Sequence, residues 1–299
     1  MKCLLATLEG MALDDLLGDD QLHHLRRLSE FGYFGALGET AALDYATIGQ
    51  RIVSGAMRSA RASEVWDCFE ADGTPYALIG RSLFSAPAFA TGVCVDCSLI
   101  AEQSVHGLTA PTEKVAGLAP WVVGRDQRVP ALAGLKEPAD LIERSHQRFE
   151  VARGFLQMGE YEFVDITDSG LRSLDAATSI KGESLDKAEY RRHLDQEVGK
   201  TIESLTSATT LLIVGVAEGY PGYFILLPAD SLAGGELQEI GLQDLMPTLL
   251  AVTGHRVPDS MEGIVFAEAD DLSVSAGQGL AAEDEAILRE RLSGLGYIE

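Results

Sequence analysis

Three acidic residues follow apolar runs that are predicted to form buried strands. Glu9 ends the first apolar run of the chain, Asp168 comes shortly after a second, and Glu218 follows the uncharged run Leu211–Val216. Because a parallel sheet places its chemistry just beyond the carboxyl ends of its strands, we expect these three carboxylates to converge. Carboxylates that converge away from water need a positive charge beside them, which a metal ion or a basic side chain can supply.

The run Leu211–Val216 also indicates the kind of sheet. Aliphatic and β-branched residues without a charge are typical of a strand that is covered on both faces. Comparable runs at 2–8 and 162–166 alternate with segments of helical periodicity. This alternation predicts an α/β fold, a doubly wound and mostly parallel sheet with helices on both faces. We expect a single domain over residues 1–299, with a looped excursion at about 82–136.

Composition and charge limit the partners. The formal charge is −23, from 23 basic and 46 acidic residues, which argues against binding to nucleic acid or to an anionic membrane. No run approaches the roughly 18 apolar residues of a membrane span, so we expect no membrane insertion. The start of the chain meets acidic residues too early for a signal peptide, and we therefore expect a cytoplasmic protein.

The cysteines permit two interpretations. The chain has four, too few for a disulfide scaffold, and Cys94 and Cys97 form a Cys-x-x-Cys pair that is compatible with redox chemistry or zinc. The pair lies within a predicted strand, and no second pair completes four zinc ligands. The sequence therefore favours buried structural thiols.

Four segments resemble parts of the alkaline phosphatase superfamily. Residues 243–263 read QDLMPTLLAVTGHRVPDSMEG and are similar to the segment that follows the last metal ligand of that superfamily. Residues 6–17 resemble its opening segment, and residues 211–219, LLIVGVAEG, resemble its strand that ends in Asp-His-Gly. Residues 290–299 resemble the closing helix of the type I phosphodiesterase and nucleotide pyrophosphatase branch. The order of the four segments implies an alkaline-phosphatase-like fold over most of the chain.

The resemblance implies two zinc-like metal ions and a nucleophilic threonine or serine. Spacing back from Gly55 puts Gln50 at the nucleophile position, and a shifted register would put Thr47 there. An amide such as that of Gln50 cannot attack phosphorus.

The metal-binding positions depart from the family pattern in the same way. Glu9 stands at the first aspartate ligand and Asp168 matches a second-site aspartate, but Arg172 replaces the histidine expected next. Ala217 and Glu218 replace the Asp-His pair. We therefore expect Arg172 to form an ion-pair network with the carboxylates and no cofactor to bind. The alternative is that Glu9, Asp168 and Glu218 hold one divalent cation, Mg²⁺, Ca²⁺, Mn²⁺ or Zn²⁺.

Two functions follow from these alternatives. The preferred one is a non-catalytic protein of this superfamily, which acts with a protein partner or assembly as a binding, scaffolding or regulatory subunit. The other is a metal-dependent hydrolase of phosphoric esters with an altered single-metal site and Thr47 as its nucleophile.

Overall fold

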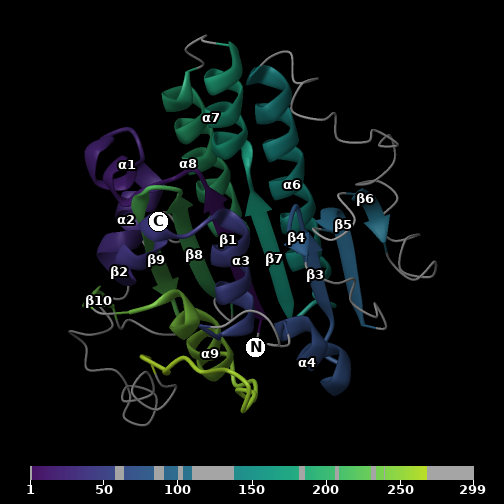
Figure 1. Ribbon diagram of the computed structural model, residues 1–299. Helices are drawn as coiled ribbons and strands as arrows, with labels where there is room; N and C mark the ends of the chain where they lie inside the picture. The colour runs from purple at the N-terminus through teal and green to yellow at the C-terminus, as the bar shows by residue number, and fades with distance from the viewer. Residues whose placement is uncertain are drawn as a thin grey trace, which may run out of the picture.

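The computed structural model describes residues 2–57, 64–83, 91–99, 104–109, 138–181, 186–205, 209–229, 234–238 and 240–267. Within them, helices lie against both faces of one twisted sheet (Figure 1). The strands are β1 (Lys2–Glu9), β2 (Tyr33–Leu37), β3 (Tyr76–Ile79), β4 (Ser82–Leu83), β5 (Gly92–Leu99), β6 (Ser104–Thr109), β7 (Phe163–Asp168), β8 (Thr209–Ala217), β9 (Tyr220–Leu227) and β10 (Gly235–Leu237). The helices are α1 (Leu13–Gly18), α2 (His23–Phe31), α3 (Tyr45–Ser54), α4 (Val65–Asp72), α6 (Pro138–Met158), α7 (Gly170–Lys181), α8 (Lys187–Ser204) and α9 (Leu242–Val252), with the 3₁₀ helix η1 (Gly38–Ala42).

The described strands form a ten-stranded sheet in the order β10-β2-β9-β8-β1-β7-β3-β5-β4, with β6 paired to β5. Strands β8, β1, β7, β3 and β5 run parallel to their neighbours in this series. Strand β9 is antiparallel to both β8 and β2. The α/β, mostly parallel fold class predicted from the sequence is confirmed.

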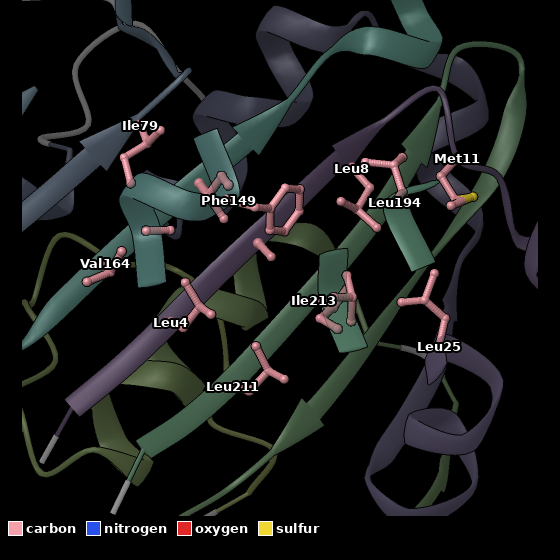
Figure 2. Packing of buried hydrophobic residues seen from close by; sticks show 14 of the residues in the cluster. Leu4, Leu8, Met11, Leu25, Ile79, Phe149, Val164, Leu194, Leu211 and Ile213 are labelled. Atoms are coloured by element: carbon pink, nitrogen blue, oxygen red, sulfur yellow. The ribbon is translucent and has the colours of Figure 1, made fainter. Parts of the chain in front are cut away.

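The central strands β1 and β8 bury both of their faces and carry few charged residues. Every residue of β8 is buried. Alternate side chains of β1 point into two separate cores, Leu4 and Leu8 into one and Leu5 into the other. Figure 2 shows the first core, where Leu4 and Leu8 lie with Phe149 of α6 and Leu194 of α8. Burial of each such side chain stabilises the fold by about 1.5–3 kcal/mol.

The helices on each face of the sheet pack into a separate core. Helices α2, α6, α7 and α8 contribute to the core with Leu4, and α3, α4 and α9 contribute to the core with Leu5. Helix α3 begins with Asp44 as its N-cap, whose side chain accepts a hydrogen bond from the Thr47 amide. None of the described helices has the length and apolar character needed to cross a membrane.

The predicted excursion contains a described hairpin. The strand expected around Cys94 and Cys97 is β5, and β6 runs antiparallel to it. The Cys94 side chain is buried, as expected of a structural thiol, whereas only the backbone of Cys97 is described. Residues 110–136 of the excursion lie outside the described residues, and the single domain over 1–299 stays a prediction.

Candidate functional site

The carboxyl ends of β1, β7 and β8 lie side by side. Leu8 pairs with Asp168 across β1 and β7, and Glu9 pairs with Val216 across β1 and β8. Glu9, Asp168 and the pair Ala217 and Glu218 therefore come to one edge of the sheet, as their positions in the sequence predict. Their functional roles stay predictions.

Arg172 makes an ion pair with Glu9 at this edge. Its Nη1 atom donates to Glu9 Oε2 at 3.0 Å, and the side chains are 45% and 10% exposed, respectively. Helix α7 can approach the end of β1 closely because residue 10 is a glycine: a Cβ there would lie 2.6 Å from the Arg172 amide nitrogen, and Gly10 also adopts φ +93°. Burial raises the pKa of Glu9, and the charge and hydrogen bond of Arg172 oppose the shift. Arg172 thus pairs with Glu9, one of the three strand-end carboxylates. The ion-pair network with all three carboxylates stays a prediction.

Tyr45, the first residue of α3, joins Arg172 to Glu218. The guanidinium carbon of Arg172 lies 4.6 Å from the centre of the Tyr45 ring, a cation–π arrangement. The Tyr45 amide donates to Glu218 Oε1 at 3.3 Å, and the Glu218 amide donates to the Tyr45 hydroxyl oxygen at 3.4 Å. Burial raises the pKa of Tyr45 to about 12. Sequence reasoning missed this residue, although Asp44 in front of it is a recognisable N-cap.

The two residues of the predicted nucleophile region lie elsewhere on α3. Thr47 is half-buried in the first turn, and Gln50 is buried farther along the helix. Neither lines the cavity beside Glu9 and Glu218, whereas Tyr45 does. A register counted from Gly55 places Gln50 in the middle of α3 and away from its N-terminus. The assignment of Thr47 or Gln50 as a nucleophile stays a prediction.

Asp168 has its own set of partners. Its Oδ1 atom accepts hydrogen bonds from the Gly170 amide at 3.0 Å and from the Tyr190 hydroxyl at 2.9 Å. A Cβ on Gly170 would lie 1.8 Å from the Tyr190 oxygen, so a glycine is needed for α8 to approach this closely. The Oδ2 atom of Asp168, a residue that is only 1% exposed, has no hydrogen-bond partner among the described residues. Sequence reasoning did not predict that Tyr190 contacts Asp168.

A second arginine, which is buried, lies near the same strand ends. Arg81 follows β3, and its Nη2 atom donates to Asp165 Oδ1 at 2.9 Å and to Thr7 Oγ1 at 3.1 Å. Burial raises the pKa of Asp165, and the charge of Arg81 opposes that shift. Arg81 and Arg148 also oppose the raised pKa of Glu9. Guanidinium groups thus supply positive charge to the carboxylates on β1 and β7.

A cavity of about 660 Å³ opens beside the Arg172–Glu9 pair. Its basic side chains are paired with carboxylates: Arg191 binds Asp15 at 2.6 Å, and Lys187 binds Asp175. The cavity is therefore of mixed charge, with both signs largely compensated within the chain. Its lining consists of Gly10, Ala12, Asp14, Asp15, Tyr45, Arg172, Asp175, Lys187, Arg191, Ala217, Glu218 and Tyr220.

The described side chains do not fit a two-metal centre. Zinc sites are built from cysteine, histidine and carboxylate ligands that converge on one point. Within the described part of the chain, no three side chains of these types are grouped closely enough to hold a metal ion. Three of the histidines have other neighbours: His146 contacts Glu197, His193 lies beside Tyr190, and His255 packs edge-on against Phe69.

No family model and no curated protein matches the chain. Solved structures do match the chain, but their sequence identities are so low that they show only the fold. A phosphonate monoester hydrolase from Silicibacter pomeroyi aligns at a TM-score of 0.56 with 14% identity, over 94% of this chain and 78% of that one. A phosphoglycerol transferase from Streptococcus pyogenes aligns at 0.53 with 10% identity, over 99% and 85% of the two chains. A protein in the alkaline phosphatase superfamily from Vibrio parahaemolyticus aligns at 0.51 with 14% identity, over 95% and 71%. The chain has the alkaline phosphatase superfamily fold.

Proposed function

We propose that this chain is a non-catalytic protein of the alkaline phosphatase superfamily that acts as a binding, scaffolding or regulatory subunit. The observation that supports this most is the position of Arg172, which binds Glu9 and stacks on Tyr45 at the carboxyl end of β1. A guanidinium group with a carboxylate partner supplies the charge that a strand-end carboxylate would otherwise obtain from a metal ion.

The N-terminus of α3 supports the same proposal. The α3 side chain that lines the cavity is Tyr45. A phenol is protonated at neutral pH and is a poor nucleophile, and burial raises the pKa of Tyr45 further, to about 12. The amide and hydroxyl of Tyr45 are already engaged with Glu218.

The partner that we propose is a protein in the cytoplasm. A formal charge of −23 favours a basic surface on that partner, because opposite charges raise association rates. The same charge disfavours nucleic acid.

Metal content and turnover together test the proposal. Purified protein would be analysed by elemental mass spectrometry and assayed with bis-p-nitrophenyl phosphate and p-nitrophenyl phosphate, with and without Zn²⁺, Mn²⁺ or Mg²⁺. We expect no stoichiometric metal and no hydrolysis above that of a protein-free reaction. Bound metal together with turnover would contradict the proposal.

One observation favours a metal-dependent hydrolase of phosphoric esters with an altered single-metal site. Asp168 Oδ2 is buried and has no hydrogen-bond partner among the described residues, and a cation would compensate it. If this alternative holds, Asp168→Asn removes the metal and the turnover together, while Glu236→Gln, on an exposed residue of β10, changes neither.

A further inference from the structure

The imidazole of His193 is half-buried in the second turn of α8, a helix that packs against α6 and α7 (Figure 1). Its Nε2 atom is buried and has no hydrogen-bond partner among the described residues. A buried ring nitrogen without a partner is unfavourable, and it is more so when the ring carries a charge. The packing of α8 therefore favours a neutral imidazole at this position.

The charged and titratable groups that face His193 come from three elements. They are Glu197 and Lys200 on α8, His146 on α6 and Asp168 on β7. The two carboxylates favour a proton on the imidazole, whereas His146 and Lys200 disfavour it. Glu197 is already compensated, because it contacts His146 Nδ1 at 3.0 Å and accepts a hydrogen bond from Lys200 at 2.7 Å. Burial prevails, and it lowers the pKa of His193 below the ordinary value of 6.5.

The first two turns of α8 connect His193 to the strand ends and to the cavity. The ring of His193 lies 5.9 Å from the ring of Tyr190, one turn earlier in the helix. The Tyr190 hydroxyl donates to Asp168 Oδ1 at 2.9 Å. Lys187 and Arg191, from the same two turns, line the cavity, and each binds a carboxylate of another helix. Opening of these turns would release Asp168 from one hydrogen-bond donor and remove part of the cavity wall.

We propose that His193 is a pH-sensitive switch in the wall of the cavity: when its imidazole takes up a proton, the first two turns of α8 open and release Tyr190 from Asp168. The neutral ring fits its buried position, whereas the charged ring needs water beside it. Local opening of the helix supplies that water. The switch goes beyond the proposed function, because it acts on the cavity wall whether the cavity binds a ligand or turns over a substrate.

The ordinary pKa of histidine sets the size of the effect. In the opened form His193 titrates at 6.5, so that at pH 5.5 about ten imidazoles are protonated for each neutral one. The folded form binds fewer protons than the opened form, because its pKa is lower. The stability of these two turns is therefore complete above pH 6.5 and is lost as the pH falls below it. Between pH 7.5 and pH 5.5 the opened population should rise up to about tenfold.

Hydrogen exchange of the amides of residues 187–193, followed by mass spectrometry at pH 7.5 and pH 5.5, tests the switch. After correction for the intrinsic exchange rates, we expect exchange in the native chain to be up to about tenfold faster at pH 5.5. His193→Leu should abolish this acceleration.

His255→Leu is the matched control. Like His193, His255 is half-buried, its Nε2 atom has no hydrogen-bond partner among the described residues, and burial lowers its pKa. It packs against Phe69 of α4, however, and so belongs to the helices on the other face of the sheet. His255→Leu should leave the acceleration in α8 unchanged.

Two outcomes of the exchange experiment would overturn the inference. If the acceleration persists in His193→Leu, another group carries the pH dependence. If His255→Leu reduces it as well, the α8 amides exchange through unfolding of the whole chain and not through a local opening.

A titration of the native chain keeps the inference testable if His193→Leu does not fold. In NMR spectra of the assigned histidine rings, the midpoint for His193 should lie below that of the exposed His23. A midpoint at or above that of His23 would refute the switch. Neither experiment depends on the ester assays, so the switch and the proposed function can fail separately.

Discussion

Arg172 Nη1 donates to Glu9 Oε2 across 3.0 Å, at the point where β1 ends and α7 begins its first turn. The pair joins an almost buried carboxylate to a guanidinium group that reaches the cavity. The guanidinium group of Arg172 is partly exposed. It neutralises the charge of Glu9 and also stacks on the ring of Tyr45. This relationship explains how a strand-end carboxylate is held without requiring a histidine next to it.

Removal of the guanidinium group should destabilise the protein in a pH-dependent way. Arg172→Met leaves Glu9 buried without its charged donor, which should cost about 1–3 kcal/mol in urea unfolding at pH 7. Burial already raises the pKa of Glu9, so the folded state takes up a proton more readily than the unfolded state as the pH falls. The loss should therefore shrink toward acidic pH. An equal loss at pH 5 and pH 7, measured against Glu236→Gln, would contradict this account.

The pair of Arg81 and Asp165 should be more sensitive, because these residues are 3% and 0% exposed. Asp165→Ala removes the carboxylate that the buried guanidinium group of Arg81 binds on β7. Of the two described hydrogen bonds that Arg81 donates to β1 and β7, only the one to Thr7 remains. We expect a loss of about 3–5 kcal/mol in chemical denaturation. The double variant Asp165→Leu/Arg81→Met should recover part of this loss, since it removes both charges. A double variant less stable than Asp165→Ala would show that packing, not charge, dominates.

Much of the fold follows from the sequence because its central strands β1 and β8 are largely apolar runs. Strands β1 and β8 bury both faces, so their apolar runs identify them directly. Helix α3 was missed because its residues have a mixed pattern, with Gly49 and the buried polar Gln50 inside the helix. Its first turn is fixed by the Asp44 cap and not by an apolar periodicity. The assignment of Thr47 or Gln50 as a nucleophile stays a prediction.

The site was predictable only in part, for a similar physical reason. The Glu9–Arg172 pair could be anticipated because the family resemblance places both residues at former metal-site positions, beyond the carboxyl ends of two strands. The partners of Tyr45 and Arg81 are 173 and 84 residues away in the sequence, and no local periodicity records such contacts. Tyr190 lies 22 residues from Asp168 in the sequence. Its apolar ring fits the periodicity of a buried helix face, and that periodicity does not show what its hydroxyl binds.

Glu197 should make the free energy of unfolding depend on pH in the acidic range. Burial alone would raise its pKa, but hydrogen bonds from Lys200, Arg153 and His146 lower it to about 2, from an ordinary value of 4.5. Its contribution to stability is therefore complete above pH 4.5 and is lost as the pH falls toward 2. Glu197→Gln should show a smaller decrease in unfolding free energy across this range than the native chain. Identical pH profiles for the two proteins would contradict the prediction.

Tyr190 should hold Asp168 in place between β7 and α8. Tyr190→Phe removes the hydroxyl that donates to Asp168 Oδ1 at 2.9 Å and leaves only the Gly170 amide on that oxygen. Because the carboxylate is buried, the lost hydrogen bond should cost about 1–3 kcal/mol in thermal unfolding. Tyr220→Phe makes the same chemical change on an exposed ring and should cost at most a few tenths of a kcal/mol. Equal losses in the two variants would mean that Asp168 does not depend on the Tyr190 hydroxyl.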